Sequence, residues 1–133
     1  MAERLTRVHA PEGVFPAAQY THVVHGTGRL VAVSGQLPLD GDGRLVGAGD
    51  PAAQARQVFE NLRRCLAAAG AGFDDVVKLT YFVTDMAYMP AIREARDAVL
   101  DPARLPASSA LQVAALVGPG FLMEVEALAL VDG

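Results

Sequence analysis

The chain has 133 residues, a length that fits one domain over 1–133, and its formal net charge is −4. Because it is acidic and has no basic stretch, its charge does not favour a nucleic-acid partner. It has no apolar run of the roughly 20 residues that a membrane helix needs, and the first residues lack the apolar core of a signal peptide. Its single cysteine cannot form an internal disulfide, so we expect a reduced, cytoplasmic protein.

The first third of the chain predicts short strands and turns. Residues 5–8 predict a first strand and residues 20–25 a second. The Gly-Thr-Gly stretch at 26–28 predicts a hairpin turn to a partner strand over 30–36. That partner begins with a continuously apolar run, which is typical of a central strand covered on both faces.

The clearest helix begins after Asp50, a good N-cap, because Pro51 suits the first helical position. Gly70 is placed to end it. The apolar positions between them follow helical spacing and form one stripe: Ala55, Val58, Phe59, Leu62, Cys65, Leu66 and Ala69. On this stripe Cys65 is expected to be a buried, inert thiol.

The second half alternates strands with one more helix. Residues 76–83 predict a strand, 87–100 a helix, and 109–116 and 122–131 the last two strands. The whole order predicts an α+β domain with one mixed β-sheet and two helices packed on one face. The other face of the sheet is left for a partner.

The composition favours self-association. Hydrophobic residues make up 52% of the chain and charged residues only 20%. A small domain has much surface for its volume, so surplus apolar surface points to an interface between copies. The alternative is that abundant alanine, which contributes little burial, inflates the hydrophobic fraction.

Two glutamates stand out in the last strand. Side chains alternate along a strand, so Glu124 and Glu126 point to the same side, about 7 Å apart. The neighbours on that side are Leu122, Leu128 and Leu130. A carboxylate among apolar neighbours is costly without a partner, which favours a half-buried site. Glu124 is the candidate for holding and activating a water molecule; the alternative is an interface glutamate paired with a backbone or arginine donor.

Several segments resemble one protein family. The C-terminal signature runs from Pro106-Ala107-Ser108-Ser109-Ala110 to Met123-Glu124-Val125, and Val33-Ser34-Gly35-Gln36-Leu37-Pro38 is a second match. The stretches at 53–57 and 77–80 agree with them. Together they resemble the reactive-intermediate deaminase (Rid, YjgF) family over nearly the whole chain. The resemblance implies a chorismate-mutase-like fold, a homotrimer, and sites between subunits that bind a small molecule.

The resemblance also implies a set of site residues. Glu124 matches the glutamate thought to position the hydrolytic water, while Tyr20, Ser34 and Gly35 match positions that line the pocket. A tyrosine hydroxyl can orient a ligand, and glycine permits close approach of the backbone. The alternatives are interface packing for Tyr20 and a strand bulge at Ser34 and Gly35.

The chain departs from the family pattern at two positions on one loop. Ser108 stands where imine-hydrolysing members carry an arginine, and Ala110 stands where deaminating members often carry a cysteine. Both positions are expected to line the pocket. A serine cannot bind a carboxylate with the two parallel hydrogen bonds of arginine. Either the ligand lacks an α-carboxylate, or Arg93, Arg96 or Arg104 replaces the missing cation.

Two hypotheses follow. The first is a Rid-like hydrolase of an imine, enamine or related metabolite, not a general 2-imino-acid deaminase. The second is a non-catalytic trimer that binds or senses a metabolite. The histidines lack metal-ligand spacing and no glycine pair opens a helix, so we expect no metal and no cofactor.

Overall fold

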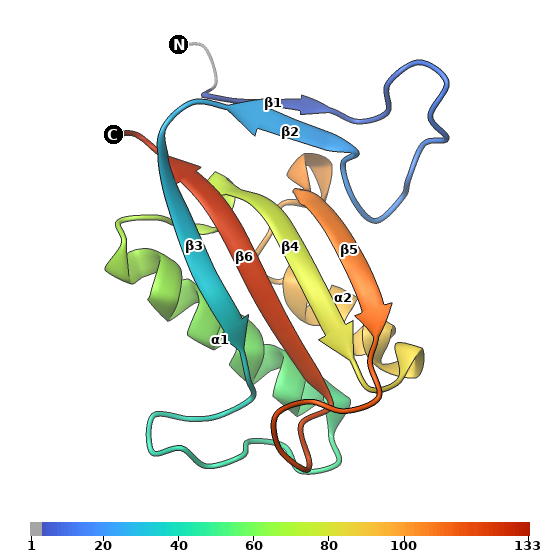
Figure 1. Ribbon diagram of the computed structural model, residues 1–133, viewed down its shortest axis with the longest axis vertical. Coiled ribbons are helices and arrows are strands. Elements are labelled where there is room, and N and C mark those ends of the chain that lie inside the picture. The colour runs from blue at the N-terminus through green and yellow to red at the C-terminus, as the bar shows by residue number, and fades with distance from the viewer. Residues whose placement is uncertain (1–3) are drawn as a thin grey trace.

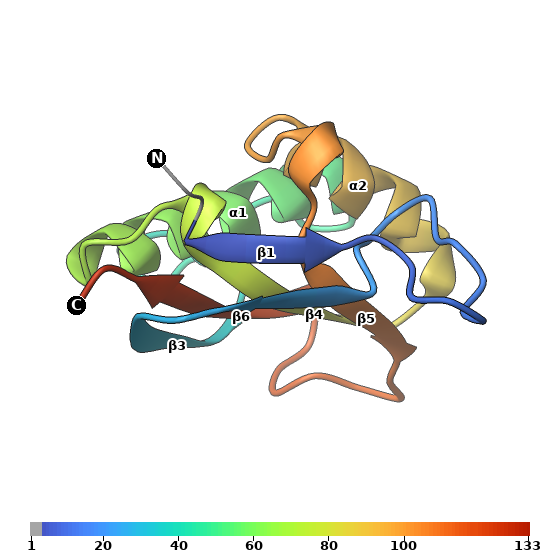
Figure 2. The same cartoon turned by 90° about the horizontal axis from the view of Figure 1, so that it is seen from above.

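A four-stranded mixed sheet with two helices on one face forms the body of the protein (Figures 1 and 2). The structure is a computed structural model and describes residues 4–133. The strand order is β3-β6-β4-β5. The elements are β3 (Arg29–Gln36), α1 (Pro51–Ala68), β4 (Val76–Val83), α2 (Met89–Asp97), β5 (Ala107–Gln112) and β6 (Met123–Val131). The α+β prediction of a mixed sheet with two helices on one side is confirmed.

The last strand joins the two halves of the sheet. β6 pairs antiparallel with β3 on one side and with β4 on the other. β4 and β5 are parallel, and the chain passes between them through α2. This crossover places α2 near the edge strand β5 (Figure 1). Residues of both elements line a pocket.

The hairpin predicted at 26–28 is wrong. β2 (Val23–Gly26) pairs with β1 (Leu5–Val8) in a separate two-stranded ladder, and β3 pairs with β6 instead. Gly28 has φ +146°, and a Cβ there would collide with the carbonyl of Val131. Glycine is therefore needed where the chain passes close to the end of β6 on its way from one ladder to the other.

The apolar run of β3 is also not a central strand covered on both faces. β3 lies at one edge of the sheet. Val31 and Val33 are buried, whereas Leu30 is 64% exposed and Ala32 is also exposed. Helices cover only one face of the sheet, so the alternate residues of an all-apolar strand remain uncovered on the other.

Helix α1 begins and ends as predicted. The Asp50 side chain accepts a hydrogen bond from the Ala53 amide at 3.2 Å, and Gly70 follows the helix with φ +73°. Glu60 forms ion pairs with Arg64, one turn further along the helix, and with Arg63. Cys65 is half-buried at the margin of the core.

A buried glutamine on α1 ties two loops to the helix. Gln54 has no exposed surface. Its Nε2 donates to the carbonyls of Gly47 and Gly120 at 3.0 and 2.9 Å, and its Oε1 accepts from the Leu122 amide at 2.9 Å. A buried polar group needs such partners, and here they hold the loops that precede α1 and β6.

The sheet has one covered face and one open face. On β6 the residues Met123, Val125, Ala127 and Ala129 are buried under the helices, while the residues between them point the other way. This open face carries Glu124, Glu126, Leu128 and Leu130, in the alternation that the sequence predicts. None of the helices described over residues 4–133 is long and apolar enough to cross a membrane.

Candidate functional site

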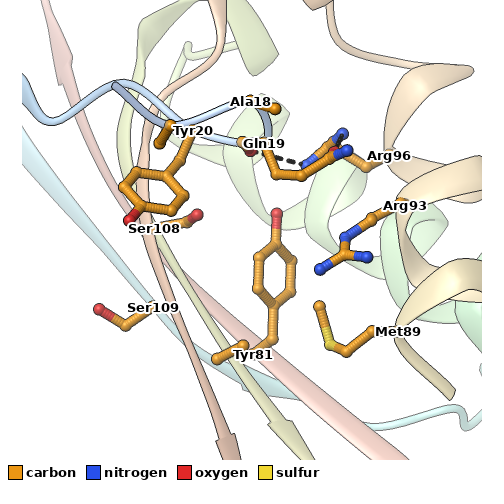
Figure 3. Close-up of a pocket in the computed structure, with 11 residues that line it drawn as sticks. Ala18, Gln19, Tyr20, Tyr81, Met89, Arg93, Arg96, Ser108 and Ser109 are labelled. Carbon is orange, nitrogen blue, oxygen red and sulfur yellow. Dashed lines mark hydrogen bonds between the residues drawn. The ribbon is translucent and has the colours of Figure 1, made fainter. Parts of the chain in front are cut away.

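A pocket of about 540 Å³ lies between α2, the edge strand β5 and the segment 17–20 that leads to β2 (Figure 3). The two guanidinium groups at it come from Arg93 and Arg96. The residues with hydroxyl groups at it are Tyr20, Tyr81, Ser108 and Ser109. Its volume suits a small metabolite.

The parallel register between β4 and β5 brings Ser108 and Ala110 to this pocket. Ser108 is aligned with Leu79 and Ala110 with Tyr81. Leu79 and Tyr81 are buried toward the helices, so their partners on β5 lie on the same side, beside α2. Ser109 alternates with them and accepts a hydrogen bond from Lys78 Nζ at 2.9 Å.

Arg96 is buried and fully occupied by protein partners. Only 4% of its surface is exposed. The guanidinium donates to the Gln19 carbonyl at 3.0 Å, to the Gln19 side-chain oxygen at 2.8 Å and to Asp97 at 2.9 Å. These bonds join α2 to the segment 17–20 and neutralise the buried charge, as a buried arginine requires.

Arg93 lies one turn before Arg96 on α2 and differs from it in burial and in its protein partners. It is half-buried, and Figure 3 shows its side chain beside the ring of Tyr81, near Met89. Within the described residues 4–133 its guanidinium makes no hydrogen bond and no ion pair. The pocket therefore holds one compensated and one uncompensated positive charge, although the chain as a whole is acidic.

Tyr81 lies under the two arginines. Burial raises the pKa of its phenol above 10.0, and the nearby charges of Arg96 and Arg93 oppose this shift only in part. The hydroxyl therefore stays protonated at neutral pH and can donate a hydrogen bond.

Tyr20 is held at the pocket by its neighbours. Its ring contacts that of His22 edge-on, with centroids 5.2 Å apart. The next residue, Thr21, is buried and donates from Oγ1 to the Leu105 carbonyl at 2.6 Å, while its amide donates to the Pro106 carbonyl at 3.1 Å. These bonds fix the segment 17–20 against the start of β5.

Glu124 lies elsewhere, on the open face of the sheet. It is aligned with Phe82 on β4 and is half-buried. Its carboxyl group lies against Gly35, where any Cβ would collide with it. Gly35 itself borders a second cavity, of about 690 Å³, between the end of β3 and the polar side chains of α1. Ser34 lines a shallower hollow next to Cys65.

The site residues predicted from the sequence thus fall into two groups in one chain. Tyr20, Ser108 and Ala110 come together at the pocket beside α2. Ser34, Gly35 and Glu124 gather where β3 meets β6, and Glu124 is not part of the lining of that pocket.

Of the three arginines proposed as replacements, Arg93 and Arg96 line the pocket with Ser108, and Arg104 lies in a 3₁₀ turn outside its lining. Sequence reasoning missed Tyr81 and Gln19 as pocket residues. Arg96 follows the buried Ile92 by four residues, so helical spacing could have placed it on the inward side of α2. No comparable signal marks Gln19.

The described residues contain no group of three or more histidine, cysteine, aspartate or glutamate side chains that could hold a metal ion. His22 is instead within hydrogen-bond distance, 2.8 Å, of the Phe15 carbonyl.

Comparison with known proteins gives relatives over nearly the full length. The sequence matches the family described as endoribonuclease L-PSP over residues 10–131. It is 34% identical over 131 residues to the 2-iminobutanoate/2-iminopropanoate deaminase of Salmonella typhimurium, covering 97% of this chain and 98% of that protein. The 3-aminoacrylate deaminase RutC of Acinetobacter baylyi is 38% identical over 120 residues, covering 90% and 93%. The crystal structure of the Rid-family protein YyfB from Yersinia pestis has a TM-score of 0.86 at 35% identity, covering 97% of this chain and 100% of that one.

Proposed function

The chain belongs to the reactive-intermediate deaminase (Rid) family, and from this premise we propose that it hydrolyses a small imine or enamine. In this reaction water adds to the carbon of the C=N group and the nitrogen takes a proton. The C–N bond then breaks, and a carbonyl compound and ammonia leave. An enamine enters the same path after it takes a proton on carbon and becomes an imine.

The observation that carries this proposal is the position of Glu124. Its half-buried carboxylate is packed against Gly35 on the open face of the sheet, where it can accept a proton from a water molecule. Tyr20 and Ser108 would orient the substrate by their hydroxyl groups. The backbone near Gly35 and Ala110 would shape the rest of the cleft.

Assembly would unite the two groups of residues. Leu30 and Leu128 leave 64% and 39% of their surface exposed on the same open face as Glu124. Apolar surface of this kind favours contact with another copy. We propose a homotrimer in which a second copy covers this face, so that the active clefts lie between subunits.

Ser108 narrows the range of substrates that the site could bind. The strand β5 offers a hydroxyl where a guanidinium would hold an α-carboxylate. We therefore propose a substrate bound differently from that of a general 2-imino-acid deaminase. The word endoribonuclease in the family description suggests another activity, but a net charge of −4 works against binding the RNA backbone.

Imine hydrolysis tests the proposal directly. An amino-acid oxidase generates imines in the assay, and keto-acid release is followed in competition with trapping by semicarbazide; enamine substrates are supplied in parallel. We expect turnover by the native protein and a loss of about 10²- to 10⁴-fold in kcat for Glu124→Gln. Glu126→Gln, the same change two residues along the same strand face, is the control and should retain activity.

Two results would contradict the proposal. One is unchanged turnover in Glu124→Gln, which would remove the role assigned to this carboxylate. The other is binding of metabolites without consumption of any imine or enamine, which would make the protein a metabolite-binding trimer. Turnover in Ser108→Arg alone would show that the hydrolytic residues are intact and that the native substrate lies outside the set tested.

A further inference from the structure

We propose that Arg93 is the anion anchor of the pocket beside α2, and that it binds the carboxylate of the substrate from the wall opposite Ser108. The catalytic consequence rests on the proposed function, whereas the binding of a carboxylate does not. The inference assigns the residue that would hold this carboxylate: Arg93 on the helix α2 takes the place of a cation on β5.

The charge of Arg93 is unpaired in the pocket. Arg93 is half-buried, and within residues 4–133 its guanidinium has no hydrogen-bond or ion-pair partner. Removing a charge from water without a partner is unfavourable. An anion in the pocket would supply that partner, with the two parallel hydrogen bonds that a guanidinium offers a carboxylate.

A second guanidinium, that of Arg96, lies three residues further along the same helix. Its charge is compensated and its donors are engaged by Gln19 and Asp97, so Arg96 acts as a positioning residue. It fixes α2 against the segment 17–20 and leaves Arg93 as the uncompensated cation of the pocket.

The rest of the lining suits an anion. None of the described residues that line the pocket is acidic, and the carboxylate of Asp97, whose charge reaches Tyr81, is paired with Arg96. The protonated hydroxyl of Tyr81 and the hydroxyls of Tyr20 and Ser108 are neutral hydrogen-bond donors. Figure 3 shows Tyr81 between Ser108 and Arg93, so that hydroxyls and cation face one small space.

Calorimetric binding of pyruvate and pyruvamide, which differ by the carboxylate, tests the anchor without any turnover. We expect the native protein to prefer pyruvate. Arg93→Gln should weaken pyruvate binding about tenfold to hundredfold and leave pyruvamide unaffected. Arg93→Lys keeps the charge and should restore part of the affinity. Arg44→Gln makes the same charge change at an exposed loop residue and should have no effect.

The outcomes separate this inference from the proposed function. Pyruvate binding that depends on Arg93, in a protein that hydrolyses no imine, would support the anchor and contradict the hydrolase. With an active enzyme, we expect Arg93→Gln to raise KM and Glu124→Gln to lower kcat. Equal pyruvate affinity in the native protein and Arg93→Gln, or no preference of the native protein for pyruvate over pyruvamide, would overturn the anchor.

Discussion

The wall of the pocket on α2 and the open face of the sheet are built in opposite ways. On α2 the charge of Arg96 is buried and satisfied inside one chain, by Gln19 and Asp97. On the open face, which also carries exposed leucines, Glu124 packs against Gly35 and makes no hydrogen bond within the described residues. Folding of one chain thus completes the wall on α2, whereas in the proposed function the face that carries Glu124 would be completed only by assembly.

Breaking the proposed trimer should give the largest effect, because it should change the open face of the sheet and not the pocket wall on α2. Leu30→Glu places a charge on exposed apolar surface, so we expect the single chain to fold but the trimer to dissociate, because burying an unpaired carboxylate at an interface is costly. Light scattering after size-exclusion chromatography measures the mass. Turnover should be lost while pyruvate binding is largely retained.

The control for this variant is Val117→Glu, at a residue that is 80% exposed in the loop before β6. It should remain a trimer. A trimeric Leu30→Glu protein would show that the interface lies elsewhere on the molecule.

Disturbing the contact between Gly35 and Glu124 should have the next largest effect, a loss of turnover. In Gly35→Ala the new methyl group collides with the carboxylate, which must move. A displacement of about 1 Å can reduce turnover roughly hundredfold. Gly41→Ala is the control, since a Cβ there meets nothing within 4 Å. Steady-state kinetics of both variants should show a loss in kcat at residue 35 only, with pyruvate affinity unchanged.

Gln54→Ala should destabilise the fold and disturb the surroundings of Glu124 more than the pocket beside α2. Two carbonyls and one amide lose their buried partner, so we expect the free energy of unfolding to fall by about 2 kcal/mol. Urea unfolding measures it. A variant as stable as the native protein would mean that water replaces the three bonds.

The smallest expected effect is that of Tyr81 on the pH dependence of the free energy of unfolding. Its pKa is raised by burial, so the folded protein keeps this proton at pH values where the unfolded chain has lost it. The free energy of unfolding should therefore fall as the pH rises past the ordinary value of 10.0. Tyr81→Phe removes this group and should show a shallower decline in urea unfolding between about pH 9 and 11. Equal slopes would contradict the shift.

Local signals in the sequence predicted local structure well. The cap at Asp50, the end at Gly70 and the alternation around Glu124 all depend on neighbours in the chain. Strand partners do not, which explains why β2 was wrongly paired with β3.

The candidate site shows the same limit. The strand residues Ser108 and Ala110 could be found from their signature. Their neighbour Gln19 comes from an irregular segment whose path is set by contacts distant in sequence. The register between β4 and β5 likewise decides which residues lie next to Ser108. No local sequence pattern specifies this register.

The anchoring by Gln54 has a consequence for how the protein can diversify. All three of its bonds reach main-chain atoms, in Gly47, Gly120 and Leu122. Since every residue other than proline has the same main-chain groups, the side chains of the two loops can change while their paths are kept. The loops lie next to the cavity at Gly35 and to the start of β6, which carries Glu124. New side chains around Glu124 can thus be tried in evolution on a backbone that stays in place.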